Sequence, residues 1–398
     1  MAPAARKAAV GFVFVTIVLD TLALGIVVPV LPILVRDFLH GDIARAAWIY
    51  GAIAATWAFL QFLASPLLGA LSDRFGRRPV LLLSNLGLGV DYLLMALAPS
   101  LGWLVVARLL SGVTASSMST AGAYIADVTP PERRAAAFGM IGAAFSIGFV
   151  LGPALGGLTG AVDPRLPFWI AAGLSLANAL YGVLILPESL PPERRAGFAL
   201  ARANPLGSLA LLRPDRVARQ LAVVHFLSQL AHQALSGIFV LYGAHRYGWS
   251  PTGTGLALAF VGVCTAIAQG ALVRPAVARL GERRVLLAGL LCGALSLSIF
   301  GLAPVSAGFA LGIPLLGLWS MANAALASLL SHRIDAAAQG RLQGALLSLT
   351  RLSGLVGPAL FAGVFGLSAD TSLIGLAWLL AAAVLAIAAV TAARATRR

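Results

Sequence analysis

The sequence is poor in charge: only 11% of its 398 residues are Asp, Glu, Lys or Arg, whereas 60% are hydrophobic. A soluble protein of this length carries about twice that fraction of charged residues, so a water-soluble globular fold is excluded. Apolar segments of about 20 residues recur along the chain, each long enough to cross a bilayer core of about 30 Å as a helix. Backbone groups inside lipid must be satisfied within the segment, which leaves helices as the expected structure.

Cysteines and catalytic motifs are scarce as well. Cys264 and Cys292 both fall in apolar segments, so we interpret them as small core residues rather than as a disulfide or metal ligands. The chain has no GxxxxGK[ST] loop, no HExxH motif, no Gly-x-Ser-x-Gly elbow and no Cys/His cluster. We therefore expect no enzyme activity, no metal and no cofactor, and any transport must be driven by an ion gradient or by the solute's own gradient.

The apolar segments predict twelve membrane-spanning helices. They cover residues 9–35, 47–71, 80–98, 101–124, 136–160, 167–187, 219–242, 251–273, 285–304, 306–330, 341–363 and 371–393. With a cytoplasmic N-terminus, most of the 28 Lys and Arg residues lie in inner loops and tails, and the positive-inside rule then predicts a multi-pass inner-membrane protein with both termini in the cytoplasm. The exceptions are Arg36, Arg45, Arg165 and Arg246 in outer loops and Arg108 and Arg351 within spans. The net charge of +14 is thus explained by topology in the lipid bilayer rather than by nucleic-acid binding.

Two internal repeats share one offset. Arg74-Phe-Gly-Arg-Arg-Pro-Val80 has a degenerate copy at 279–285, and Gly152-Pro-Ala-Leu155 recurs at 357–360, each 205 residues later. A proline-rich polar connector at 188–218 separates the halves. We predict an all-α polytopic protein of two pseudo-symmetric six-helix bundles, residues 1–187 and 219–398, which is the architecture of the major facilitator transporters.

Ionisable residues inside the membrane are the main functional candidates, because each costs about 2.5–3.5 kcal/mol on insertion scales. Asp20 and Asp91 both lie about 16 Å from the cytoplasmic ends of their spans, close to the midplane. Burial favours the protonated form of a carboxyl group, so both are predicted proton carriers, or else structural partners of a hydroxyl or of Arg108. Arg108 keeps its charge when buried and is predicted to pair with one of the two.

Arg351, in the predicted eleventh span, has no acidic residue near it in its own or neighbouring spans. Two interpretations stay open. Either its side chain reaches Asp20 or Asp91, or it meets an anionic group of a substrate.

The turn between the predicted second and third spans is unusually polar for its position between two apolar runs. Its marked residues are Gly69, Asp73, Arg74, Gly76, Arg77 and Arg78. Charges at such a turn can pair in one conformation and separate in another, so we predict a conformational gate. In the second-half copy Ala278 stands where Asp73 would fall, which predicts a latch in the first half only.

The predicted fifth span carries Gly148, Gly152 and Gly156 every four residues, with Pro153 among them. Such a stripe lets another helix backbone pack closely, and the proline bends the helix. Tight packing alone would also account for the glycines. The combination of a bend with a stripe favours a surface on which helices move.

The predicted seventh span carries Gln229, His232 and Gln233. The i, i+4 spacing places the two glutamines on one helix face, where they can hydrogen-bond a substrate. His232 is interpreted either as a helix-to-helix hydrogen-bonding residue or as a proton carrier.

These motifs together resemble the tetracycline/proton antiporters among the drug exporters of the major facilitator superfamily. The resemblance rests on Asp20 with Pro29-Val-Leu-Pro32, the 71–82 loop, Asp91-Tyr-Leu93, Arg108-Leu-Leu-Ser-Gly112, Ile125-Ala-Asp127, the helix-5 stripe, 229–233, 280–284 and 342–350. It implies exchange of protons for a small organic solute by alternating access, with Asp20, Asp91 and Arg108 in the coupling region. It also implies a cytoplasmic network of Asp73, Arg77 and Asp127.

Three positions depart from that family. Thr265 and Gly293 stand where the tetracycline pumps have a histidine and an aspartate, and Arg351 replaces a small or amide residue. We therefore expect a monomeric exporter of a drug-like solute that is tetracycline-like, anionic or amphipathic. The alternatives are an uptake symporter of the same fold and a non-transporting membrane sensor.

Overall fold

The computed structural model describes residues 3–114, 117–195, 211, 215–335 and 338–397. The first-half helices are α1 Pro3–Val27, α2 Leu31–Phe38, α3 Ile43–Phe75, α4 Arg77–Leu97, α5 Leu101–Thr114, α6 Ser117–Val128, α7 Pro131–Val162 and α8 Leu166–Ile185, followed by the 3-10 turn η1 Pro192–Arg194. The second-half helices are α9 Arg216–Tyr247, α10 Pro251–Ile267, the π-helical turn η4 Ala268–Leu272, α11 Val273–Leu280, α12 Glu282–Leu302, α13 Ser306–Ser331, α14 Gln339–Ser368 and α15 Leu376–Ala395.

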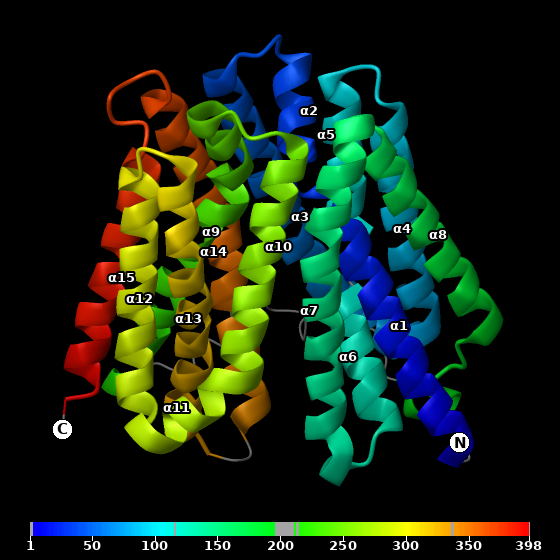
Figure 1. Cartoon of the computed structure of the whole chain (residues 1–398). Coiled ribbons are helices and arrows are strands. Elements are labelled where there is room, and N and C mark those ends of the chain that lie inside the picture. The colour runs from blue at the N-terminus through cyan, green and yellow to red at the C-terminus, as the bar shows by residue number, and fades with distance from the viewer. Residues whose placement is uncertain (1–2, 115–116, 196–210, 212–214, 336–337, 398) are drawn as a thin grey trace. The chain divides into compact units, whose positions relative to one another are not determined.

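Twelve spans are found among these described residues, as predicted. Three of them combine shorter elements: α1 with α2, α5 with α6, and α10 with η4 and α11. Within the second half α12, α13 and α15 run side by side (Figure 1). The predicted all-helical polytopic fold is thus confirmed.

The helices end where the local sequence provides a cap. Asp215 precedes α9 and its side chain accepts a hydrogen bond from the Val217 N–H at 2.8 Å, which satisfies one of the free amides of the first turn. Gly248 ends α9 in the left-handed conformation, with φ of 65°, a geometry that glycine adopts without strain. Arg165, one of the outer-loop arginines, donates to the carbonyl oxygens of Ala96 and Ala98 at 3.2 and 2.8 Å and so closes the end of α4.

The sequence repeat is also a structural repeat. α4 and α12 are both 21 residues long, and each begins directly after a glycine with positive φ, Gly76 at 110° and Gly281 at 78°. Gly76 and Gly281 are 205 residues apart, the same offset as the two sequence motifs. The second copy of the turn therefore keeps its backbone conformation although Ala278 and Glu282 stand in the places of Asp73 and Arg77.

The chain forms two compact units. Unit 1 comprises Met1–Leu34, Thr56–Asn204 and Ser250–Ala259, and unit 2 comprises Val35–Ala55, Pro205–Trp249 and Phe260–Arg398. Each unit thus includes the first part of one long helix, α3 or α10, whose remainder belongs to the other unit. Residues 196–210 and 212–214 of the predicted connector lie outside the described part of the chain, and the predicted boundaries at 188–218 stay a prediction.

Candidate functional site

The buried charges of unit 1 form one pair. Asp91 of α4 is fully buried and Arg108 of α5 is 8% exposed, and the Arg108 guanidinium donates to the Asp91 carboxylate. The guanidinium also lies 5.7 Å from the centre of the Tyr92 ring, a cation–π contact. Of the two partners that the sequence left open for Arg108, the structure selects Asp91.

Asp20 of α1 is in a different environment. Its Oδ1 accepts a hydrogen bond from Asn178 Nδ2 of α8 at 2.9 Å, and Ser117 of α6 also hydrogen-bonds to it. The same Asn178 nitrogen donates to the Thr16 carbonyl at 3.2 Å. Asp20 therefore contacts neutral groups where Asp91 contacts a cation. Sequence reading missed Asn178, although an amide within the apolar run of α8 was a visible signal.

In unit 2 a polar cluster joins α9 to α14. His225 Nε2 lies 3.0 Å from Thr350 Oγ1 and 3.2 Å from the Leu346 carbonyl, and Gln229 Nε2 donates to Thr350 Oγ1 at 3.2 Å. One threonine hydroxyl thus connects two side chains that stand one turn apart on α9. Gln229, a predicted substrate ligand, is held by this contact, and Thr350 is a further site residue that the sequence analysis did not single out.

Gln233 lies one turn further along α9 and has a separate neighbour. A Cβ atom on Gly357 would come within 2.4 Å of Gln233 Cβ, so the two helix backbones approach closely here. Gln233 Oε1 accepts a hydrogen bond from Ser236 at 3.0 Å. The two glutamines share a helix face as predicted, but they have different polar partners.

His232 lies against an indole ring. Its imidazole centre is 5.7 Å from that of Trp319 on α13, and the Trp319 Nε1–H donates to Ser228 at 3.1 Å. A Cβ atom on Gly293 would lie 2.6 Å from Trp319 Cγ. The tryptophan thus fills the space next to the glycine that replaces the family's aspartate, and Trp319 was not recognised from sequence.

Arg351 lies on α14, half-buried. Among the described residues its guanidinium makes no hydrogen bond or ion pair. The acidic residues of unit 2 lie at or beyond the ends of its helices, at Asp37, Asp42, Asp215, Glu282, Asp335 and Asp370. Within unit 2 this cation therefore has no partner of opposite charge in the membrane interior.

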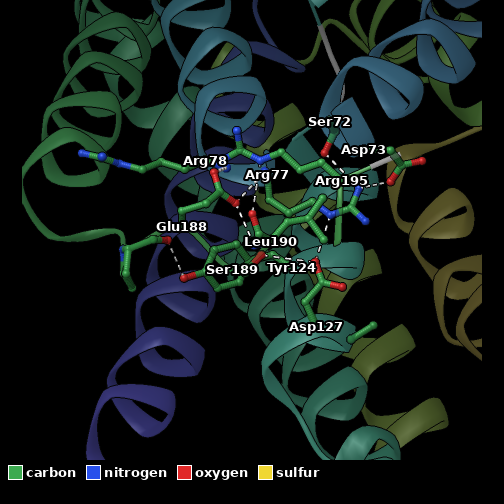
Figure 2. A network of polar contacts seen from close by, with 12 residues as sticks. Ser72, Asp73, Arg77, Arg78, Tyr124, Asp127, Glu188, Ser189, Leu190 and Arg195 are labelled. Carbon is green, nitrogen blue, oxygen red and sulfur yellow. Dashed lines mark hydrogen bonds and ion pairs between the residues drawn. The ribbon is translucent and has the colours of Figure 1, made fainter. Parts of the chain in front are cut away.

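At the α3–α4 turn the structure brings the predicted network together (Figure 2). Arg77 Nη1 donates to Asp73 at 2.5 Å and to Ser72 at 3.1 Å, and its Nε donates to Asp127 of α6 at 3.0 Å. Arg77 is mostly buried, with 12% of its side chain exposed. A single guanidinium therefore joins the end of the second span, the start of the third and the end of the fourth.

Glu188 is a further member of this network that the sequence analysis missed. Its carboxylate accepts the backbone N–H groups of Arg77 at 2.8 Å and of Arg78 at 3.2 Å. These are free amides of the first turn of α4, where the helix dipole also favours an anion. Tyr124 donates to the adjacent Pro187 carbonyl at 2.8 Å, so the segment after α8 is fastened to the turn (Figure 2). The feature of the sequence that could have indicated Glu188 is an acidic residue directly after the predicted sixth span.

The remaining turn residues contribute in different ways. Arg78 Nη2 donates to the Val183 carbonyl at 2.6 Å, and the Arg74 guanidinium lies 5.2 Å from the centre of the Phe75 ring. Gly76 has positive φ and faces Glu188 so closely that a Cβ atom would lie 2.2 Å from its carboxylate. Gly69 has open space around it and takes no part in the network.

The glycine stripe of α7 packs on α1 within unit 1. Cβ atoms on Gly148, Gly152 and Gly156 would meet Thr21, Gly25 and Ile26 at 2.7 Å or less. This is close backbone packing inside one unit, which agrees with the interpretation that the stripe serves tight packing. The interpretation as a surface on which helices move stays a prediction.

An adjacent face of α7 meets the first part of α10. A Cβ atom on Gly255 would lie 2.2 Å from the Pro153 carbonyl oxygen and 2.8 Å from Gly157 Cα. Unit 2 contains the counterpart, because a Cβ atom on Gly51 would lie 3.1 Å from the Pro358 carbonyl and 2.7 Å from Ala362 Cβ. Each residue of one contact is 204 or 205 positions from its counterpart in the other. The repeat thus includes a pair of tight helix crossings.

Comparison with known proteins identifies the family. The model of the Major Facilitator Superfamily matches residues 13–358. The chain belongs to the Major Facilitator Superfamily. Members of this superfamily that it resembles include the class C tetracycline resistance protein of Escherichia coli, 41% identical over 92% of both chains. The class D protein of Salmonella ordonez is 36% identical over 92% of this chain and 91% of that protein.

Solved superfamily structures agree with this assignment. The human organic anion transporter MFSD10 (TETRAN) has a TM-score of 0.71 and 27% identity, and the match covers 98% of this chain and all of that one. The nucleoside transporter NupG, at a TM-score of 0.79 and 15% identity, shows the shared fold alone. The resemblance inferred from the motifs is therefore confirmed. The chain is a multi-pass membrane transporter, and its relatives are transporters rather than enzymes, as expected.

Proposed function

We propose that this protein is a proton-coupled antiporter that exports a small organic, drug-like solute by alternating access. The tetracycline resistance proteins, 41% and 36% identical over 92% of this chain, support export. The observation that carries proton coupling is the contrast between the two membrane-interior carboxylates. Asp91 is paired with Arg108, whereas the partners of Asp20 are the neutral Asn178 and Ser117.

This contrast assigns different roles to the carboxylates. An anion without a compensating charge in a low-dielectric site gains by binding a proton, so Asp20 is the proton carrier. Asn178 Oδ1 is buried and, among the described atoms, has no hydrogen-bond partner. It can accept the O–H of the protonated acid, while its Nδ2 already donates to the ionised form. Arg108 provides the counter-charge of Asp91, and this pair joins α4 to α5.

The test is flux in proteoliposomes under an imposed pH gradient, with tetracycline as the first solute. Addition of the solute should release protons, and Asp20→Asn should abolish this release while the protein stays folded. Asp163→Asn, at an exposed outer-loop carboxylate, is the matched control and should couple normally. Proton release from Asp20→Asn at the wild-type level contradicts the assignment. Solute entry together with protons indicates the uptake symporter, and binding without flux indicates the sensor.

We further propose that the solute carries a negative charge in addition to an apolar part. The support is the unpaired guanidinium of Arg351 within the membrane interior of unit 2 and the resemblance to a structure described as an organic anion transporter. A tetracycline-like solute remains the other candidate because of the resistance proteins. Gln229, His232 and Gln233 on α9 are the accompanying substrate-binding candidates.

A matched ligand pair tests this charge recognition. An aromatic carboxylate and its neutral amide differ only in charge, so Arg351→Gln should weaken binding of the carboxylate by about tenfold or more and leave the amide unchanged. Arg351→Lys should retain part of the preference, and Arg246→Gln at the exposed end of α9 should retain all of it. Equal losses for both ligands rule out a charge-reading role for Arg351.

The remaining elements of the proposal concern topology and conformational change. We propose a monomer in the inner membrane with cytoplasmic termini and two six-helix halves joined by 188–218. The gate is formed by Asp73, Arg74, Gly76, Arg77, Arg78 and Asp127, with Gly69 one turn earlier on α3, and the α7 stripe of Gly148, Gly152, Pro153 and Gly156 is the surface along which α1 and α7 shift during transport. A reporter fused to the C-terminus tests the orientation, because it should be active only in the cytoplasm.

A further inference from the structure

Two charge pairs occupy equivalent places in the two halves of the chain. Arg77 is the first residue of α4 and pairs with Asp127 near the end of α6. Glu282 is the first residue of α12, and His332, directly after α13, lies with its Nδ1 3.5 Å from Glu282 Oε2. Glu282 follows Arg77 by 205 positions, and His332 follows Asp127 by the same number. The second half therefore has the same pair with its charges reversed.

The surroundings of the second pair fix the carboxylate and expose the histidine. Ser328, one turn before His332 on α13, donates to Glu282 Oε1. The Glu282 side chain is 21% exposed and that of His332 is 69% exposed. An anion at the first residue of a helix is also favoured by the helix dipole. Glu282 is thus held in place by α12 and α13, while protons from the aqueous phase can reach His332.

The reversal changes how the pair responds to pH. In unit 1 the cation is a guanidinium, which stays charged at every physiological pH, whereas imidazole gains and loses its charge between about pH 5 and 8. We propose that Glu282 and His332 form a proton-binding latch of unit 2. A proton on His332 completes the ion pair and fastens the start of α12 to the end of α13, and its loss weakens this contact.

The latch holds fewer elements than its counterpart. Arg77 also bonds to Asp73 at the end of α3, but the equivalent of Asp73 is Ala278, whose methyl group cannot pair with a charge. None of the residues of α11 is buried, and the π-helical turn η4 precedes this helix. The protonated latch therefore joins the ninth and tenth spans and does not include the end of the eighth. The prediction of a latch in the first half only is refined accordingly.

Glu282 is the acidic group in contact with His332, and six other charged residues lie on the neighbouring elements. They are Arg279 on α11, Arg283 and Arg284 on α12, Arg333 beside His332, Asp215 before α9 and Asp335 in the following loop. Arg333 pairs with Asp215 at 3.7 Å, and Arg283 donates to Thr396 at 3.1 Å. Two of the nearby cations are thus engaged with other partners.

Thiol labelling of a buried probe tests the latch. Val285 in the first turn of α12 is 2% exposed, and its counterpart Val80 in α4 is 4% exposed. In a protein with Cys264→Ala and Cys292→Ala, Val285→Cys reacts only when the start of α12 opens. Dividing its labelling rate by that of the exposed probe Leu280→Cys at the same pH removes the effect of pH on thiol reactivity.

We expect the normalised labelling of the Val285→Cys protein to rise about two- to fivefold from pH 6 to pH 8, the range expected for an exposed ion pair. Added to this protein, His332→Arg should keep labelling at the low level throughout, and His332→Gln should keep it at the high level. The Val80→Cys protein should show no pH response because Arg77 does not titrate. A pH response that survives His332→Gln, or an equal response at Val80→Cys, overturns the proposal.

The same measurement in an Asp20→Asn background separates this proposal from the proposed function. The latch should respond to pH as before, because Asp20 belongs to unit 1 and Glu282 and His332 belong to unit 2. If Asp20→Asn abolishes proton-coupled flux but preserves the labelling response, the effect is confined to Asp20. If the labelling response is missing although flux is normal, the latch proposal fails and the proposed function is unaffected.

Discussion

Trp319 occupies the space that any side chain on Gly293 would need. A Cβ atom on Gly293 would lie 2.6 Å from both Trp319 Cγ and Leu385 Cδ2. The family's aspartate at this position and the tryptophan of this chain therefore exclude each other.

This relationship predicts that restoring the family residue is harmful. Gly293→Asp should destabilise the protein by at least the 1–3 kcal/mol typical of overpacking, measured as the thermal unfolding midpoint in detergent. Gly293→Asp combined with Trp319→Ala should recover part of the loss, because the smaller residue makes room. The reference is Gly173→Ala on α8, where a Cβ atom meets open space. Failure of the second substitution to restore stability would show that Trp319 is not the source of the conflict.

The Asp91–Arg108 pair is expected to behave as one unit in folding. Removal of one partner leaves an uncompensated buried charge, so Asp91→Asn or Arg108→Gln alone should cost about 3–5 kcal/mol. The double substitution should cost clearly less than the sum of the two. A double-mutant cycle on unfolding free energies measures this coupling, and strictly additive losses would contradict it.

Glu188 is expected to stabilise the start of α4 from outside the helix. Glu188→Ala removes the acceptor of two backbone amides, Arg77 and Arg78, and should cost about 0.5–2 kcal/mol, the range for loss of a helix cap. Glu193→Ala, five residues later and exposed, should be neutral. Hydrogen exchange at the first turn of α4 provides the local readout, and unchanged protection in Glu188→Ala would disprove capping.

The paired crossings at Gly255 and Gly51 should be equally intolerant of side chains. Gly255→Val would place atoms against the Pro153 carbonyl, and Gly51→Val would place them against Ala362. Each should lower stability by about 1–3 kcal/mol or more and reduce solute flux. Gly139→Val, on an open part of α7, is the control for the effect of valine on helix propensity. Equal stability of the Gly255→Val and Gly139→Val proteins would contradict a tight crossing at Gly255.

The sequence was sufficient for the helices because their signals are local. A span needs enough consecutive apolar residues to cross the bilayer, and all twelve predicted spans are found among the described residues. Eleven have both ends within five residues of the predicted ones, and the eighth extends seven residues further, to Leu280. The internal repeat also lies in the sequence, since two motifs share one offset. The turn network was predictable in part, because Asp73 and Arg77 stand four residues apart on a short polar stretch.

Contacts between distant helices could not be derived in the same way. Arg108 had two carboxylates at similar depth, and helix rotation and packing select Asp91 over Asp20. Glu188 is 111 residues from the amide that it accepts, and its role depends on where the chain runs after α8. The reversal of charge between Arg77–Asp127 and Glu282–His332 became visible only when the second pair was seen to be in contact.

By itself, the sequence determined a twelve-helix membrane transporter with an internal repeat, because hydrophobic length, loop charge and motif spacing are properties of the chain in one dimension. Tertiary structure alone decided which buried charge is paired, that Arg351 makes no ion pair among the described residues of its unit, and that a tryptophan lies against Gly293. These outcomes depend on which helix faces meet, and many rotations of the same helices satisfy the same hydrophobic pattern. The physical difference is between burial, which local composition encodes, and specific contact, which needs the assembled fold.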